Sequence, residues 1–359
     1  MTNAERERVE GFGRLEDGLR QAGGWYLWGP YLSERQWGTV REDYSADGDA
    51  CTYLPHDQAR SRAYRWGEDG MAGFCDVEQR LCLGLALWNG RDPILKERMF
   101  GLTGAEANHG EDVKEYWWYL DAVPSHAWNR WRYHYPQAAF PYDDLLAGNR
   151  RRGKLDPEYE LLDTGVFDDD RYWIVEVHYV KATPTDLLIS VQVTNAGPEE
   201  ATLHVLPTAW FRNTWSWEED APRPRLRGRT GGSVAVEHPF LGDLELLASS
   251  GPDGAAPTAL FCENETNNRH LYGVPGPTPT PRTGSTTTSS GGPRPSTRTG
   301  TAPRRRSGTG CGSGRRQRRS CGSASGPSAA GQTPPTRSAP PSTGSWPSAA
   351  RRPTPSTPS

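Results

Sequence analysis

The last 84 residues of the chain, 276–359, contain no Asp, Glu or Lys and no Leu, Ile, Val, Met, Phe, Tyr or His. They consist of Gly, Pro, Ser, Thr, Ala and Arg, with two Cys, two Gln and one Trp. A segment of this composition cannot bury enough apolar surface to offset the entropy lost on ordering. The sequence therefore predicts a disordered tail over residues 276–359 that builds no core of its own.

The same break divides the charge. Of the 41 Lys and Arg residues, 13 are arginines of the tail, so residues 1–275 hold 28 basic and all 44 acidic residues, a net charge of −16. One interpretation is a native basic tail that contacts nucleic-acid phosphates. Native tails of that kind usually include Lys and some acid, so we do not expect nucleic acid as a partner. The interpretation that we favour is an out-of-frame tail, because GC-rich codons read in the wrong frame yield Arg, Gly, Pro, Ala, Ser and Thr.

Residues 1–275 carry the patterns of a folded protein. The charged segment 1–22 is predicted to form a short helix, and residues 23–275 a β-sandwich domain. Runs of strand-forming residues separated by turn residues predict antiparallel strands at 81–88, 116–120, 130–135, 171–181, 186–194, 201–206, 233–238, 244–247 and 258–262. Turn signals at 89–90 and 195–198 predict hairpins. We expect a mainly β fold, an incomplete antiparallel β-sandwich with long ordered loops, the N-terminal helix and the disordered tail.

The ends and the cysteines suggest a compartment. The N-terminus is charged and lacks the apolar region of a signal peptide, and no apolar stretch reaches the roughly 18 residues of a membrane span. Cys51, Cys75, Cys82 and Cys262 have no metal-ligand spacing and are expected to be thiols. We expect a cytoplasmic protein with no membrane contact, no metal and no cofactor.

Three segments combine aromatic rings with charged side chains. The first contains Trp66, Glu68 and Asp69, and the second contains His109, Glu111 and Asp112. The third spans residues 210–218. Sugars stack their apolar faces on aromatic rings and need donors and acceptors for their hydroxyls, so these segments are typical of sugar sites. The alternative interpretation is that the rings belong to the core and the charges pair at the surface.

Five longer runs carry a resemblance to a known family. They span residues 27–45, 60–70, 87–98, 108–116 and 206–213. With these runs, residues 20–274 resemble the N-terminal part of glycoside hydrolase family 63, the relatives of processing α-glucosidases and mannosylglycerate hydrolases. The resemblance implies a β-sandwich that precedes a catalytic (α/α)6 barrel, and an inverting hydrolysis of α-glycosides by an Asp and a Glu of that barrel.

No segment of this chain matches the barrel, so the resemblance assigns no catalytic residue here. It implies the N-terminal fragment of a glucosidase-like hydrolase, inactive alone, whose intact relatives act on an oligosaccharide or glucoside. Trp66, Glu68, Asp69, His109, Glu111 and Asp112 are then candidates for substrate contact at the rim of the sugar pocket. Two alternatives stay open: a free-standing carbohydrate-binding sandwich, and nucleic-acid binding through the tail.

Overall fold

The computed structural model describes residues 23–32, 45–47, 55–65, 70–99, 101–102, 116–153, 155–217, 220–230, 232–276, 278, 281–282, 303–313 and 318–320. The chain divides into two compact units, Met1–Ser323 and Ala324–Ser359, and every described residue belongs to the first. The predicted helix at 1–22 lies outside the described residues. The division at Ser323 lies beyond the break that the sequence predicts at residue 275.

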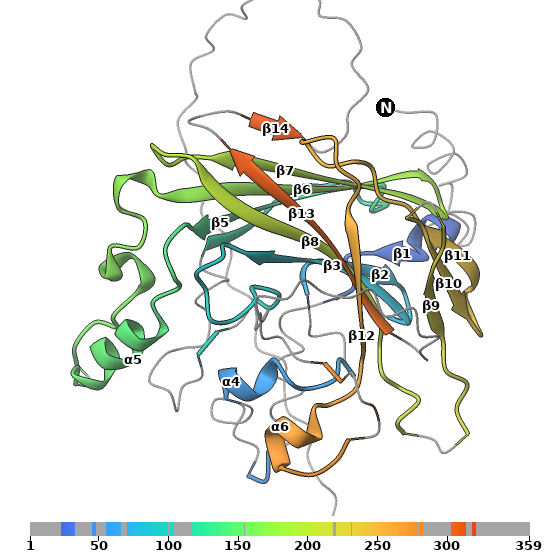
Figure 1. The fold of residues 1–359 in the computed structure, drawn as a ribbon, viewed down its shortest axis with the longest axis horizontal. Helices are drawn as coiled ribbons and strands as arrows, with labels where there is room; N and C mark the ends of the chain where they lie inside the picture. Colours follow the sequence, from blue (N-terminus) through green and yellow to red (C-terminus); the bar gives the residue numbers. More distant parts are fainter. Residues whose placement is uncertain are drawn as a thin grey trace, which may run out of the picture. The chain divides into compact units, whose positions relative to one another are not determined.

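Three antiparallel sheets make up the described part of the first unit (Figure 1). The six-stranded sheet has the order β1 (Trp28–Gly29), β2 (Met71–Asp76), β3 (Leu81–Trp88), β8 (Ala201–Phe211), β13 (Pro303–Ser313) and β12 (Thr258–Glu263). The five-stranded sheet has the order β14 (Arg318–Ser320), β7 (Asp186–Asn195), β6 (Tyr172–Thr183), β5 (Trp128–Pro136) and β4 (Trp117–Ala122). The small sheet has the order β11 (Gly242–Leu246), β10 (Val234–His238) and β9 (Arg225–Gly228).

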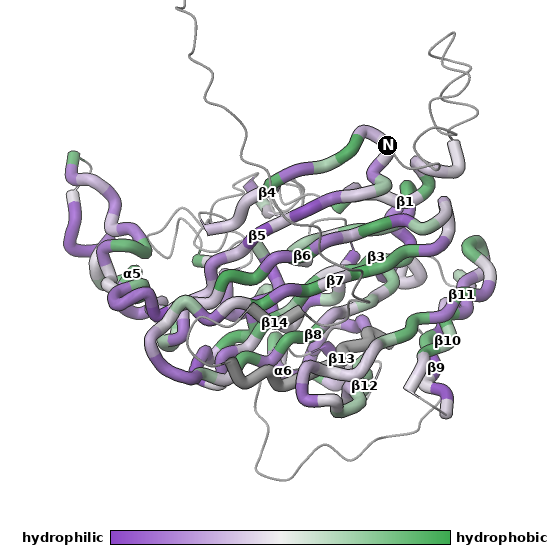
Figure 2. The backbone as a smooth tube through the Cα atoms, turned by 90° about the horizontal axis from the view of Figure 1, so that it is seen from above, coloured by the Kyte–Doolittle hydropathy of each residue, from purple (hydrophilic) through white to green (hydrophobic). Residues whose placement is uncertain are grey.

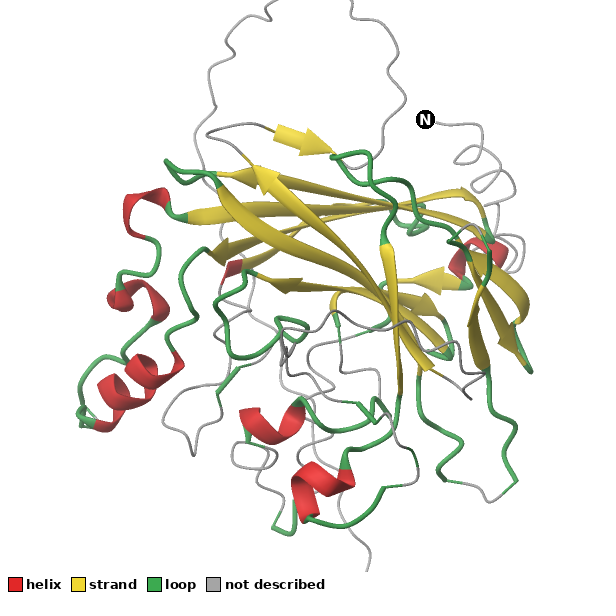
Figure 3. Ribbon diagram, in the orientation of Figure 1, coloured by secondary structure: helices red, strands yellow, loops and turns green. Residues whose placement is uncertain are grey.

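The helices are short. The α-helices of the described residues are α4 (His56–Ala59), α5 (Tyr142–Arg150) and α6 (Asn268–Tyr272), and the 3-10 helices are η1 (Gly23–Tyr26), η4 (Leu161–Thr164) and η5 (Asp168–Asp170). Strands predominate in the colouring of Figure 3. The predicted mainly β fold of antiparallel sheets is confirmed, and each of the nine predicted runs overlaps an observed strand.

The main core lies between the six-stranded and five-stranded sheets. In a strand, alternate side chains point to the same face. This period of two places Trp131, Tyr133 and Tyr135 of β5 in the core, with Leu81, Leu83, Leu85 and Leu87 of β3 and Leu203, Val205, Ala209 and Phe211 of β8. The Phe74 and Tyr179 rings stack here with centroids 4.6 Å apart and planes 8° apart. Large aromatic rings therefore supply much of the buried surface that holds the sheets together.

The outer face of the six-stranded sheet is also covered. Cys75, Cys82 and Trp210 point away from the main core and pack with Leu32 and Tyr64. Ala86 and Leu206 of the same face pack against Leu95. Segments 55–65 and 92–98 thus cover this face, and Figure 3 shows α4 and α6 on that side of the sheets.

The aromatic segment at 210–218 is mostly structural. Trp210 is 1% exposed and Phe211 is fully buried. Trp215 is also buried, whereas Trp217 is 47% exposed. The interpretation of these rings as core residues is therefore confirmed for three of the four.

The hairpin predicted at 195–198 is wrong in its pairing, and the one predicted at 89–90 is reduced to a single antiparallel bridge. The turn at 195–198 connects β7, which pairs with β6 and β14, to β8, which pairs with β3 and β13, so the chain crosses between sheets there. The turn after β3 leads to one antiparallel bridge between Leu87 and Lys96. Turn residues predict a change of direction, but they do not encode which sheet the next strand joins.

Two strands come from the acid-free tail, which the composition did not predict. The strand β13 lies between β8 and β12 and pairs antiparallel with both, while β14 pairs with β7 (Figure 1). Composition measures how much apolar surface side chains can bury. A β-ladder is built from main-chain N–H and C=O groups, which every residue except proline supplies in full, so the pairing does not require apolar side chains.

The N-terminal segment is tied to the five-stranded sheet by a buried lysine. Lys181 at the end of β6 is 5% exposed and donates hydrogen bonds to the backbone carbonyls of Trp25 and Trp28, and to that of Ser125 at 3.2 Å. Buried ammonium groups need such partners. This one side chain therefore joins η1, β1 and the turn between β4 and β5.

The described cysteines carry free thiols, and the described helices are short. Cys75, Cys82 and Cys262 are free thiols, as expected, and Cys51 lies outside the described residues. Of the helices in the described ranges, none is long and apolar enough to cross a membrane.

Candidate functional site

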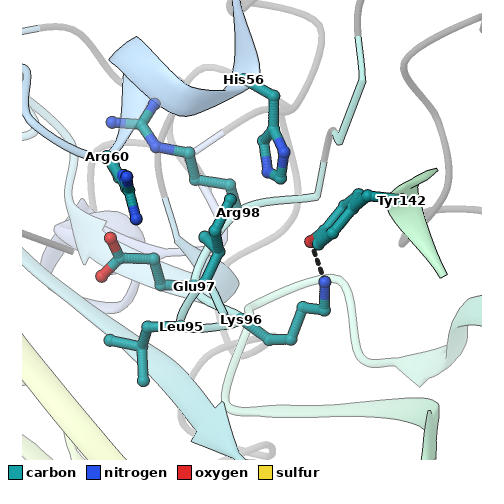
Figure 4. Close-up of a pocket in the computed structure, with 8 residues that line it drawn as sticks. His56, Arg60, Leu95, Lys96, Glu97, Arg98 and Tyr142 are labelled. Atoms are coloured by element: carbon teal, nitrogen blue, oxygen red, sulfur yellow. Dashed lines mark hydrogen bonds between the residues drawn. The ribbon is translucent and has the colours of Figure 1, made fainter. Parts of the chain in front are cut away.

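A polar hollow lies beside the outer face of the six-stranded sheet. Its lining comes from α4, the segment after β3 and the start of α5, and consists of His56, Arg60, Ile94, Leu95, Lys96, Glu97, Arg98 and Tyr142 (Figure 4). The empty volume, counted with its open mouth, is about 310 Å³. Most of that volume is open solvent: the enclosed space is about 10 Å³, room for about one water molecule and far below the roughly 300–1,000 Å³ of ligand pockets.

Two buried polar side chains in the turn after β3, Asn89 and Asp92, fix the segment that carries Lys96. The Asn89 side-chain oxygen accepts hydrogen bonds from the backbone N–H groups of Arg91 at 2.9 Å and Asp92 at 2.8 Å. The Asn89 amide also donates to the Ala138 carbonyl at 2.7 Å. Asp92 accepts from the Phe140 N–H at 2.5 Å and from the Tyr135 hydroxyl. Burial, and then the Asp92 carboxylate, raise the pKa of Tyr135 well above its usual value.

Lys96 is buried among aromatic rings. It is 2% exposed, and its ammonium group lies 3.5 Å from the centroid of the Phe140 ring and 4.2 Å from that of Tyr142. It donates a hydrogen bond to the Tyr142 hydroxyl, the dashed line in Figure 4. The negative faces of the rings stabilise the cation where water is excluded. The local sequence therefore places a buried lysine amine, held against two rings, at the wall of the hollow.

His56 faces the same ring from α4. The His56 and Tyr142 ring centroids are 4.7 Å apart. Burial, and then the charges of Lys96, Arg98 and Arg60, lower the pKa of His56 to about 3. The imidazole is therefore neutral at physiological pH, with one nitrogen that donates and one that accepts.

Glu97 is held by an arginine from beyond the predicted break. The Arg282 guanidinium lies 2.7 Å from the Glu97 carboxylate, and the two side chains are 0% and 4% exposed. Arg282 also donates to the Ala59 carbonyl at 3.0 Å and to the Arg62 carbonyl, and lies 3.8 Å from the centroid of the Tyr64 ring. The ion pair joins α4, the wall of the hollow and the start of the tail.

The side chain of Asn264 also holds segment 55–65 in place. The Asn264 amide oxygen accepts from the Tyr64 N–H at 2.7 Å, and its NH₂ group donates to the carbonyls of Tyr64 at 2.9 Å and Phe211 at 2.7 Å. Because Asn264 is fully buried, its loss would leave the Tyr64 N–H and the Phe211 carbonyl without this partner, whereas the Tyr64 carbonyl keeps a hydrogen bond from the Asn213 N–H at 2.6 Å. Asn264 therefore fixes segment 55–65 against β8.

A neighbouring pair of glutamates has unequal environments. Glu265 accepts hydrogen bonds from the Trp215 indole at 2.9 Å and the Asn213 amide at 3.2 Å. Burial, and then the charge of Glu265, raise the pKa of Glu263 to about 7, while Arg223 opposes the shift. Glycoside hydrolysis needs two carboxylates with different pKa values at an open pocket. Glu263 and Glu265 do not line the hollow.

The lining of the hollow does not suit glycoside hydrolysis. Among its described lining residues Glu97 is the one carboxylate, and that group is bound to Arg282. Hydrolysis of a glycosidic bond normally uses two carboxylates on either side of the bond. The lining offers instead a neutral imidazole, an aromatic ring and cationic side chains around a space for about one water molecule, so these groups order the wall and do not enclose a sugar.

The six substrate-contact residues predicted from the sequence lie outside the described residues. Trp66, Glu68 and Asp69 fall in 66–69, and His109, Glu111 and Asp112 fall in 103–115. Of the described residues before these gaps, Tyr64 packs under Arg282 beside Arg98, and Leu102 packs in one cluster with Phe140. The roles of the six residues stay predictions.

The lining residues themselves were missed by sequence reasoning. Lys96, Glu97 and Arg98 form a charged triplet that follows a turn, and such a triplet is normally a solvated loop. The one available signal was the chain of turn-forming Asn89 and Asp92 before it, which indicates order but not burial. Within the described ranges, no three His, Cys, Asp or Glu side chains gather as metal ligands would.

Comparison with known proteins gives one relative. No family model and no solved structure matches the chain. The chain is similar to the uncharacterized protein YMR196W of Saccharomyces cerevisiae, with 37% identity over 289 residues. The match covers 72% of this chain and 27% of the yeast protein, so the chain spans about a quarter of the length of that relative.

Proposed function

We propose that this chain is the N-terminal β-sandwich part of a longer, glucosidase-like glycoside hydrolase and that it does not hydrolyse glycosides alone. The observation that carries the proposal is the match to a relative of which the chain covers 27% at 37% identity. In that relative the matched sandwich belongs to a much longer chain, which leaves room for a separate catalytic domain. The family resemblance of residues 20–274 supplies the reaction class, an inverting hydrolysis of α-glycosides.

The sandwich acts as a rigid support in this proposal. Two sheets packed through large rings hold segments 55–65 and 92–98, and the buried Lys96, Glu97 and Arg98 order the wall of the hollow. Segments 66–69 and 103–115 follow Arg65 and Leu102 in the sequence. We propose that Trp66, Glu68, Asp69, His109, Glu111 and Asp112 reach the rim of the sugar pocket of the complete enzyme. The free thiols Cys75, Cys82 and Cys262 support the cytoplasmic location that forms part of the proposal.

The first test is catalytic. The purified chain is incubated with nitrophenyl α-glucoside, α-mannoside and natural α-linked disaccharides, and released sugar is measured. We expect no turnover above the buffer control, because the two catalytic carboxylates of the family lie in a barrel that this chain does not contain. Hydrolysis abolished by heat denaturation of the sample would contradict the proposal.

The second test concerns the rim. In a full-length relative with measurable activity, the residues aligned with Trp66 and Asp112 are changed to Ala and Asn. We expect kcat/KM to fall about tenfold or more in each variant, since each would lose a contact to the bound sugar. A matched change at the position of the exposed Trp217 serves as control. Unchanged kinetics in both rim variants would remove the rim role.

A further inference from the structure

The outer face of the five-stranded sheet, on the far side of the sandwich from the hollow, carries an ordered set of side chains. Figure 2 shows β4, β5, β6 and β7 side by side in that order. The register pairs Trp118 with Arg132, Arg132 with Glu176, and Glu176 with Gln192. Paired residues of antiparallel strands point to the same side of a sheet. Because Trp131, Tyr133 and Val177 point into the core, these four side chains point outward.

Three rings form a diagonal line across this face. The Trp118 and His134 ring centroids are 4.6 Å apart, and those of His134 and Tyr172 are 5.0 Å apart. Trp118 stands at the end of the line on β4, the edge strand of the sheet, and is 38% exposed. The His134 and Tyr172 rings stack, and the Trp118 ring meets His134 at an interplanar angle of 60°, an edge contact that holds the indole while part of it stays in water. A fixed, partly exposed indole is what the apolar face of a sugar ring needs for stacking.

The polar groups beside the rings are fixed as well. The Glu176 side chain is 8% exposed and receives hydrogen bonds from Arg130 at 2.8 Å and Arg132 at 2.9 Å. Burial tends to raise the pKa of Glu176, but the hydrogen bonds from the two arginines hold it below its usual value. The two arginine side chains remain 31% and 35% exposed. They therefore offer planar donors at the surface whose orientation is set before a ligand arrives, which lowers the entropy cost of binding.

Over strands β4–β7 the outward charges balance. The register also places Asp121 opposite Arg130, so two arginines stand against two carboxylates. A phosphate-rich ligand would require a net positive surface, and the core of a protein–protein interface is usually depleted of charged groups. Aromatic rings among neutralised, rigid hydrogen-bonding groups favour a neutral, hydroxyl-rich ligand.

We propose that the outer face of β4–β7 is a binding site for a neutral oligosaccharide, with Trp118 as its stacking platform and Arg130 and Arg132 as donors to sugar hydroxyls. The site runs across neighbouring strands of a sheet, so it binds along a chain of sugars, and the proposal assigns it no catalytic group. It does not depend on the hydrolase proposal, because a sandwich without any catalytic partner would carry the same face.

The experiment is a calorimetric titration of the full chain with maltoheptaose and with cellohexaose. We expect saturable binding of at least one of them, with Trp118→Ala weakening the affinity about tenfold or more, the equivalent of one lost stacking contact. Trp217→Ala, which removes another exposed indole, is the matched control and should leave the affinity unchanged. Raising the salt from about 50 mM to about 500 mM should change Kd by no more than about twofold, since no phosphate-like charge is neutralised.

Three results would overturn the proposal. These are no binding of either sugar by the wild-type chain up to about 10 mM, equal affinities of the Trp118→Ala and Trp217→Ala variants, and a steep loss of binding with salt. Thermal unfolding of both variants checks that they are folded. If Trp118→Ala does not fold, Arg132→Lys replaces it, because it keeps the charge and loses the planar donor. Loss of sugar affinity in that variant supports the site, and unchanged affinity overturns it.

Discussion

The buried ion pair between Arg282 and Glu97 gives the sharpest test of how this chain folds. Arg282 belongs to the acid-free tail, yet it is fully buried and contacts the carboxylate of Glu97 and two backbone carbonyls. We predict that Arg282→Ala strongly lowers the free energy of unfolding. The reason is that the variant leaves a carboxylate, 3% exposed, without its 2.7 Å partner.

The magnitude follows from the burial. Removing one partner of a buried pair typically costs about 3–5 kcal/mol, because the remaining charge keeps its desolvation cost. Glu97 keeps other contacts besides Arg282, so the lower end applies, about 3 kcal/mol. For a domain of this size that loss lowers Tm by about 6–12 °C.

The assay is urea unfolding followed by tryptophan fluorescence, with thermal unfolding beside it. The matched control is Arg229→Ala, which breaks an exposed pair with Glu245 at 3.5 Å and should cost at most about 1 kcal/mol. A double-mutant cycle with Glu97→Gln isolates the coupling between the two groups. If Arg282→Ala lowers the free energy of unfolding no more than Arg229→Ala does, the reasoning is refuted. The start of the tail then does not pack against the folded domain.

Three further predictions concern other buried groups. Lys181→Met should cost about 2–4 kcal/mol in urea unfolding, because three backbone carbonyls lose a charged donor. Asn264→Ala should cost about 2–3 kcal/mol by the same measurement, and Asn264→Asp no less, since a carboxylate cannot donate to the two carbonyls. Glu263 has a pKa of about 7 in the folded state against an ordinary value of 4.5, so the folded state binds more protons between these values and wild-type stability falls as pH rises from about 4.5 to about 7. Thermal unfolding across that range should show Glu263→Gln gaining stability over the wild type as pH rises, and a constant difference would contradict the shift.

Strands with a clear apolar pattern were predictable from the sequence. Residues 81–88 are predicted as a strand and form β3 with the same bounds, because four leucines at alternate positions face one core. By contrast, β2 was missed: its sequence has no regular period, and the ladder to β3 is irregular between Met71 and Phe74. A strand with such an irregularity places its side chains out of alternation, so periodicity does not reveal it.

The candidate site was less predictable than the fold. The groups that define it are polar residues that the fold buries by contacts across large separations, such as Arg282 to Glu97, 185 residues apart. Nothing local distinguishes such an arginine from a solvated one. The rings of residues 210–218 show the opposite error. Their pattern is typical of a sugar site, but most of these rings pack in the core. The outer face of β4–β7 emerged only from the register of three ladders.

The nucleotide sequence around and beyond codon 275 tests the central claim most directly. The claim is that this sandwich is one part of a longer hydrolase whose reading frame changes there. The stability of the Arg282 variant reports how the chain folds as it is, whereas the gene reports where its tail comes from. We predict that a second frame downstream of codon 275 encodes further sandwich strands and a helical barrel similar to the relative. A single uninterrupted frame into the tail, with no such sequence in either other frame, would contradict the account.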